Sequence, residues 1–250
     1  MINKITSRLL AKLRPDYVVH DGLVLPSPET RYGGEHFRDN TVFLKSGERE
    51  VQRLINLCGL SSETSVLEVG CGRGRFPIAI LRTMGDIKFY TGLDVDKRSI
   101  EWCHKYIGRQ HPNFKFVHLN LKNERYNPRG EKLDETFSFP FESGQFGLIY
   151  LYSVFSHLEE KDVRTYLKEF KRILAPNGKV FLTAFIEEGV ANVSVNPPDY
   201  VMNWSGPLHC VRYEKSFLCS LFTHAGFTLK KIEYETETDK QSAFYLHSSV

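Results

Sequence analysis

The chain has 250 residues, 41% of them hydrophobic and 25% charged, a composition typical of a soluble globular protein with one well-filled core. Its 33 basic and 30 acidic residues leave a net charge of +3, which is too small to indicate a nucleic-acid partner. The 5 cysteines include no C-x-x-C pair, so we expect reduced thiols in a cytoplasmic protein, and neither a disulfide framework nor a zinc site. No apolar run reaches membrane-spanning length, and the start lacks the apolar core of a signal peptide.

Residues 1–45 are predicted to form an N-terminal helix and a cap segment. Apolar residues recur at helical spacing from Ile2 to Leu13, with basic residues between them, and Pro15 ends the pattern. Such a basic helix serves as a lid, a dimer contact or a membrane-surface anchor, and the sequence leaves these roles open.

Residues 16–40 are expected to be irregular, because they contain two prolines and a pair of glycines. Within them, the run PETRYGGEHFRD holds Tyr32 and His36, which are weak candidates for contact with a substrate. A plain surface loop and a cap over a substrate pocket are both consistent with this composition.

From residue 46 onwards, strand and helix patterns alternate as one domain, 46–250. Helices are predicted at 46–60, 75–84, 96–110, 161–174 and 216–225. Strands are predicted at 66–69, 88–94, 114–120, 146–151, 179–186, 229–236 and 243–248. The alternation indicates an α/β fold with a mostly parallel sheet and right-handed crossovers, closed by an antiparallel hairpin.

The stretch VLEVGCGRG, residues 66–74, combines a buried strand with a glycine turn and the start of a helix. Glycines at such a turn permit positive φ and let a ligand approach the backbone closely. Arg75 replaces the third glycine of the dinucleotide fingerprint, and no lysine follows Gly74 as a P-loop requires. A carboxylate, Asp94, lies 20 residues past Gly74 at the end of the next strand, where it suits the two hydroxyls of a ribose.

Two polar insertions, 122–138 and 187–213, follow strands of the predicted sheet. In an open α/β sheet the loops that follow parallel strands emerge at the same carboxyl edge, where ligands bind. We therefore expect both insertions to lie over the glycine turn and to form the acceptor pocket.

The motif E-x-G-C-G-x-G, followed by GLDVD, resembles the class I S-adenosylmethionine-dependent methyltransferases. The resemblance continues in family order through KFVHLNL, FPFESGQFGLIYLYSVFSHL and LKEFKRILAPNGKVFLTAF, and it covers about residues 46–186. It implies the Rossmann-like fold of that family, with a mostly parallel seven-stranded sheet, a terminal antiparallel hairpin and helices on both faces.

The resemblance also implies the cofactor, S-adenosylmethionine, and the residues that hold it. Glu68 would lie near the methionine ammonium, and Asp94 would bind the ribose. The whole implied set is Glu68, Gly70, Cys71, Gly72, Gly74, Asp94, Val95, Asn120, Leu121 and Tyr152. Val95, Asn120 and Leu121 would surround the adenine, and Tyr152 would offer backbone contacts. Cys71 is better explained as a small packing residue.

Methyl transfer to a hydroxyl needs a base, and histidine suits that role. His157, just past the fourth strand, is the leading candidate, although a histidine packed at a helix start is the simpler explanation of this residue. His209 and Tyr213, at the end of the second insertion, are rival bases or substrate binders. No cluster of acidic residues indicates a metal, so we expect none.

The leading prediction is a methyltransferase that acts on oxygen of a small molecule, such as a natural product or sugar. A protein or tRNA acceptor is an alternative, supported only by the basic N-terminal helix. A non-catalytic cofactor-binding or interaction module and an aminopropyltransferase are further alternatives. The complete cofactor motif argues against a non-catalytic module. The scarcity of acidic residues in the second insertion argues against an aminopropyltransferase, which would bind a polyamine.

Overall fold

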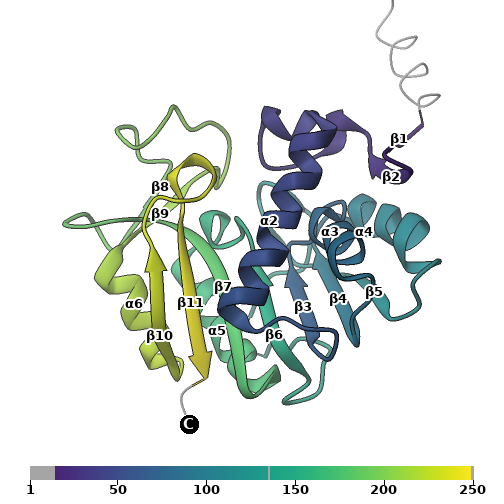
Figure 1. The fold of residues 1–250 in the computed structure, drawn as a ribbon. Coiled ribbons are helices and arrows are strands. Elements are labelled where there is room, and N and C mark those ends of the chain that lie inside the picture. The colour runs from purple at the N-terminus through teal and green to yellow at the C-terminus, as the bar shows by residue number, and fades with distance from the viewer. Residues whose placement is uncertain (1–14, 135, 249–250) are drawn as a thin grey trace, which may run out of the picture.

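A central mixed sheet organises the protein, whose computed structural model describes residues 15–134 and 136–248 (Figure 1). Seven strands follow one another across it in the order β10-β11-β7-β6-β3-β4-β5. These strands are β3 (Ser65–Val69), β4 (Phe89–Asp94), β5 (Phe114–His118), β6 (Phe146–Leu151), β7 (Leu174–Glu187), β10 (Phe227–Glu233) and β11 (Ser242–Ser248). The pairs among β3, β4, β5, β6 and β7 are parallel, and β11 is antiparallel to both neighbours. The predicted parallel sheet with a terminal antiparallel hairpin is therefore confirmed.

Helices cover both faces of this sheet because its central strands are apolar on both sides. Neighbouring residues of β3 enter different cores: Val66 packs with one set of helices and Leu67 with the other. The first face carries α2 (Asn40–Cys58), α3 (Arg75–Met84) and α4 (Lys97–Cys103). The second face carries α5 (Glu160–Ile173) and α6 (Lys215–His224). In Figure 1, α2 crosses in front of the sheet and α5 lies behind it.

The first helix of the domain begins earlier than the apolar periodicity predicts. Asp39 caps α2 by accepting a hydrogen bond from the backbone N–H of Val42 at 2.8 Å, so the helix starts at Asn40 rather than at residue 46. Asp96 caps α4 in the predicted way, although α4 gives way after Cys103 to a π-helical turn, η3 (His104–Gly108).

The gap expected between the predicted helix 161–174 and the predicted strand 179–186 is absent, because β7 already begins at Leu174 and includes Pro176, Asn177 and Gly178. Within β7, the pairing with β6 jumps from Leu174 opposite Phe146 to Lys179 opposite Leu148. The intervening residues form a bulge in which Asn177 adopts a φ of 61°.

The segment expected to be irregular contains a β-hairpin, made of β1 (Tyr17–His20) and β2 (Leu23–Pro26). Its turn is Asp21-Gly22, and both residues have positive φ, which is the conformation that favours Asp-Gly in two-residue hairpins. Two short 3₁₀ turns, η1 (Pro28–Thr30) and η2 (Glu35–Arg38), lead from the hairpin to α2. The predicted N-terminal helix lies outside the described residues.

The second insertion also contains strands, β8 (Val193–Val195) and β9 (Val211–Glu214). β9 runs parallel to the last residues of β7, which places this insertion at the carboxyl edge of the sheet. Because β11 is antiparallel to β7 and begins opposite Ala184, the turn between β10 and β11 reaches the same edge. This turn holds η5 (Thr238–Lys240), and the short η4 (Phe155–His157) follows β6. Across the described residues, no helix is long and apolar enough to cross a membrane.

Candidate active site

A cavity of about 520 Å³ lies at the carboxyl edge of the sheet, over the turn between β3 and α3. Its walls come from that turn, the ends of β4 and β6, the segment between β2 and α2, both insertions and the β10–β11 turn. The predicted site residues that line it are Glu68, Gly70, Cys71, Gly72, Asp94, Val95, Leu121, Tyr152, His157 and His209. Gly74, Asn120 and Tyr213 lie outside it.

The glycine turn is tight because neighbouring side chains leave no room for a Cβ. A Cβ on Gly70, whose φ is 79°, would lie 2.6 Å from the Cγ2 of Val154. A Cβ on Gly74 would lie 2.7 Å from the Cδ1 of Ile107, so Gly74 serves the packing between α3 and η3. The backbone N–H groups of Gly70 and Cys71 both donate to the carbonyl oxygen of Leu93, which ties the turn to β4.

Asp94 ends β4 beside this turn. Its Oδ2 accepts a hydrogen bond from the backbone N–H of Gly72 at 2.7 Å, and its Oδ1 accepts one from the backbone N–H of Asp96 at 2.8 Å. Burial raises the pKa of Asp94 to about 6, against the lowering effect of these backbone donors. The carboxylate is therefore ionised near neutral pH, and each oxygen retains a lone pair for a further donor.

Glu68 is a second buried carboxyl group at the cavity, with 5% of its surface exposed. Burial raises its pKa to about 8, and the hydrogen bond from the Tyr90 hydroxyl, together with the Arg75 charge, only partly opposes that rise. Arg75 lies between the rings of Phe37 and Tyr152 at the same wall. Glu68 is thus a proton-bearing acid near pH 7 that a cation in the cavity would ionise.

The remaining predicted cofactor residues have distinct surroundings. Burial raises the pKa of the Cys71 thiol well above its usual value, which fits a packing role. Asn120 is exposed outside the cavity, and its side chain is engaged by Glu131 and Asn127. Tyr152 presents its ring to Arg75, while its hydroxyl contacts Thr238 at 3.1 Å.

His157 lies in η4 with its ring directed between the two insertions. Its Nδ1–H donates to the carbonyl oxygen of Leu208 at 2.8 Å, because a carbonyl can only accept. Its Nε2 then accepts from the Tyr126 hydroxyl at 3.3 Å. Burial lowers the pKa of His157 to about 4, and the nearby Arg125 adds to this effect. The ring is therefore neutral near pH 7, and its Nε2 is linked to the cavity through the hydroxyl of Tyr126.

Of the two rival bases, His209 lines the cavity and Tyr213 does not. The His209 ring packs against Trp204, and its Nδ1 accepts from the backbone N–H of Ser205. Tyr213 is fully buried in β9, outside the cavity, and its hydroxyl donates to the carbonyl oxygen of Leu158 at 2.6 Å. The structure thus places Tyr213 away from the cavity in which an acceptor is expected, with its hydroxyl engaged by the backbone.

The two weaker candidates for substrate contact, Tyr32 and His36, also differ in their position relative to the cavity. Tyr32 lines the cavity, donates its hydroxyl to Asp96 at 2.9 Å and packs edge-on against Tyr126. His36 does not line the cavity, and its ring packs on Phe37 instead.

Several cavity residues carried no signal in the sequence. Arg125 and Tyr126 belong to the first insertion, whose only marked pattern is the turn at Asn127-Pro128. Arg73 sits inside the glycine motif, and its buried Nε has no partner among the described residues. The β10–β11 turn adds Thr238, Asp239 and Gln241.

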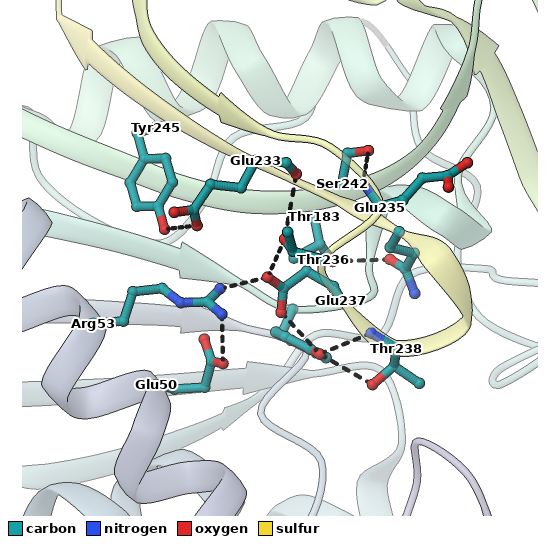
Figure 2. A network of polar contacts seen from close by, with 12 residues as sticks. Glu50, Arg53, Thr183, Glu233, Glu235, Thr236, Glu237, Thr238, Ser242 and Tyr245 are labelled. Carbon is teal, nitrogen blue, oxygen red and sulfur yellow. Dashed lines mark hydrogen bonds and ion pairs between the residues drawn. The ribbon is translucent and has the colours of Figure 1, made fainter.

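A polar network fixes that β10–β11 turn (Figure 2). Glu237 points from the turn towards Arg53 of α2, and the two groups form an ion pair at 2.7 Å. Arg53 also faces Glu50 at 3.7 Å, and the other Glu237 oxygen lies 3.3 Å from the Tyr152 hydroxyl. The turn is thereby held against the same tyrosine that lines the cavity.

A family model described as a methyltransferase domain matches residues 66–178, a range that runs from the glycine turn to the bulge in β7. Over this range, the resemblance to the class I S-adenosylmethionine-dependent methyltransferases is confirmed. The cofactor of the chain is S-adenosylmethionine, and its activity is methyl transfer from that cofactor. The Glu68 carboxyl group, the Asp94 carboxylate and the confined glycine turn fit such a group, which carries an ammonium and a ribose.

Solved structures with this methyltransferase fold include three that illustrate its range. An S-adenosylmethionine-dependent methyltransferase from Aquifex aeolicus has a TM-score of 0.55 at 15% identity, over 83% of this chain and 92% of that one. A 1,6-didemethyltoxoflavin-N1-methyltransferase from Burkholderia thailandensis has a TM-score of 0.55 at 14% identity, over 83% of this chain and 79% of that one. The [4+2]-cyclase SpnF has a TM-score of 0.58 at 13% identity, over 81% of this chain and 82% of that one. Because a cyclase shares the fold, the acceptor chemistry of this methyltransferase must be argued from its own site.

Proposed function

We propose that this methyltransferase methylates an oxygen atom of a small-molecule acceptor, with His157 as the general base. The observation that carries the proposal is the neutral imidazole of His157, whose Nε2 accepts from the hydroxyl of Tyr126, a residue that lines the cavity. The alternative of a protein or tRNA acceptor has less support, because the segment before α2 and both insertions confine the cavity. The Burkholderia thailandensis neighbour likewise holds a small molecule together with S-adenosylhomocysteine.

Within this proposal, residues of the β3–α3 and β4–α4 turns hold the cofactor. Glu68 faces the ammonium of its methionine part, Asp94 accepts from its ribose hydroxyls, and Gly70 and Gly72 allow its close approach to the backbone. Val95 and Leu121 supply apolar contacts to the adenine, and Tyr152 covers the methionine part. The segment before α2 and the two insertions close the acceptor pocket.

The cofactor supplies a methyl group on a positively charged sulfur, which makes the methyl carbon electrophilic. The protein aligns the acceptor and restricts water. As the methyl group leaves sulfur for the acceptor oxygen, the acceptor hydroxyl gives its proton to the Tyr126 oxygen, and the Tyr126 hydroxyl proton passes to Nε2 of His157. The carbonyl of Leu208 stabilises the resulting imidazolium through Nδ1–H. Because the His157 pKa is about 4, this base suits an acidic hydroxyl, such as a phenol, whose proton becomes labile as the bond forms.

The test has two stages. Calorimetric titration should show binding of S-adenosylmethionine and S-adenosylhomocysteine, and none of NAD. Turnover of phenolic acceptors by His157→Ala should then fall by ~10² or more, whereas cofactor affinity stays unchanged.

His224→Gln is the matched control, because His224 lies at the exposed end of α6 and contacts the carbonyl oxygen of Ser220 in its own helix. Unchanged turnover in His157→Ala would move the base to His209 or remove the need for one.

A further inference from the structure

Arg125 reaches across the cavity from the first insertion to the second. Its Nε–H donates to the Tyr126 hydroxyl at 3.3 Å, and its Nη1 lies 3.5 Å from the carbonyl oxygen of Ser205. The guanidinium also lies 5.6 Å from the centre of the Tyr126 ring. All of these partners are neutral.

Arg125 forms no ion pair within residues 15–134 and 136–248. Its neighbour Lys122, which also lines the cavity, is neutralised by Glu124 at 3.0 Å. Burial lowers the pKa of both His157 and His209, and the positive charge of Arg125 lowers both further, while the cavity carboxylate Asp239 only partly opposes this at His209. A half-buried guanidinium without a counter-charge favours an anionic ligand.

The space beside this charge is walled by aromatic side chains. Tyr126 lies on one side, and Phe185 and Trp204 form an edge-to-face pair with ring centres 5.2 Å apart. Such walls suit a flat ring, because aromatic groups stack or meet edge-on with favourable electrostatics.

The positions of the base and the charge limit the ring's substituents. The Tyr126 hydroxyl lies 3.3 Å from both Nε2 of His157 and Nε of Arg125, so the two groups are close together. A ligand that meets both must carry its hydroxyl and its anionic group on one side of the ring, not at opposite ends.

We propose that Arg125 binds a carboxylate on the acceptor, and that the acceptor is a hydroxylated aromatic carboxylic acid whose carboxylate lies near the methylated hydroxyl. This inference rests on the proposed function and names its substrate class. Arg125 acts as a specificity residue: its planar fork binds both carboxylate oxygens, while the hydroxyl faces Tyr126 and His157.

The test compares 3-hydroxybenzoate with 3-hydroxybenzamide, which has nearly the same shape but no charge. Calorimetry measures their binding with and without S-adenosylhomocysteine, so that no turnover is needed. The native protein should bind the acid at least about tenfold more tightly than the amide, and more tightly than 4-hydroxybenzoate. Arg125→Gln should remove the preference for the acid, and Arg125→Lys should keep part of it.

Arg129→Gln is the matched control, because Arg129 belongs to the same insertion, is exposed and lies outside the cavity. It should retain the full preference, and all three variants should bind S-adenosylhomocysteine as the native protein does. Equal binding of acid and amide, no binding of either, or a preserved preference in Arg125→Gln would overturn the inference. Failure of S-adenosylhomocysteine to bind would instead count against the proposed function.

Discussion

Arg53 of α2 and Glu237 of the β10–β11 turn form an ion pair at 2.7 Å in which only 3% of the Glu237 side chain is exposed. The pair connects a helix on one face of the sheet to the last turn of the chain (Figure 2). Tyr152, whose hydroxyl lies 3.3 Å from the other Glu237 oxygen, extends the connection to the cavity. A buried pair of this kind contributes little net stability, but losing one partner leaves the other charge stranded.

Arg53→Met should therefore destabilise the protein by about 3 kcal/mol, because Glu237 and Glu50 would both lose their cationic neighbour. Urea unfolding measures this change. Lys215→Met breaks the exposed pair with Glu188 and should cost clearly less than Arg53→Met, because water screens exposed charges. Equal losses in the two variants would contradict the distinction between buried and exposed pairs.

Glu68 should give cofactor binding a proton signature. Its pKa of about 8 means that it is largely protonated near pH 7, whereas Asp94, with a pKa of about 6, is already ionised. A bound ammonium favours the Glu68 carboxylate, so binding releases a proton, and affinity rises as the pH approaches about 8. Calorimetry in buffers of different ionisation enthalpy detects that proton. Glu68→Gln should abolish its release, and persistence of the release would assign it to another group.

The same shift sets the sign of the Glu68 contribution to stability. The folded protein holds this proton more tightly than the unfolded chain, whose carboxyl has the ordinary pKa of 4.5. The contribution is thus fully present below 4.5 and lost as the pH rises through about 8. Glu68→Gln should remove this part of the pH dependence in urea unfolding.

His157 should make turnover insensitive to pH across the neutral range. Its pKa is lowered to about 4, so the base is neutral above that value and is lost only as the pH falls through it. The folded pKa lies below the ordinary value of 6.5, so the related stability is present above 6.5 and declines towards about pH 4. A turnover profile with a midpoint near the ordinary value of 6.5 would contradict the assignment of His157 as the base.

Gly70 should tolerate no side chain, for a reason beyond its positive φ. Gly70→Ala combines backbone strain of about 1 kcal/mol with a contact of 2.6 Å to Val154. Gly144 has a φ of 69° and no atom within 4 Å of the position that a Cβ would take, so Gly144→Ala experiences the strain alone. Gly70→Ala should lose more stability and bind S-adenosylhomocysteine more weakly, and adding Val154→Ala should restore part of both. Matching behaviour of the two single variants would exclude the steric explanation.

Tyr213 should matter for stability and not for chemistry. Tyr213→Phe removes the hydrogen bond to Leu158 and leaves that buried carbonyl without its donor, at a cost of about 1–3 kcal/mol in unfolding free energy. Turnover by the folded variant should remain near that of the native protein. A fall of ~10² in turnover without a stability change would restore Tyr213 as a base.

The sequence by itself determined the sheet, the glycine turn and the place of Asp94. These features depend on short-range patterns: apolar strands, glycines that a tight turn requires, and caps such as Asp96. The Asp21-Gly22 hairpin was also readable in this way, although the nearby prolines obscured it.

Only the tertiary structure decided which side chains meet in the cavity. Arg125 and Tyr126 reach His157 because the two insertions pack together, and the β10–β11 turn joins them because β11 is antiparallel to β7. His209 faces the cavity while Tyr213 is buried, because Tyr213 lies in β9, which pairs with β7. Such long-range pairings depend on packing between distant segments, and no local pattern in the chain encodes them.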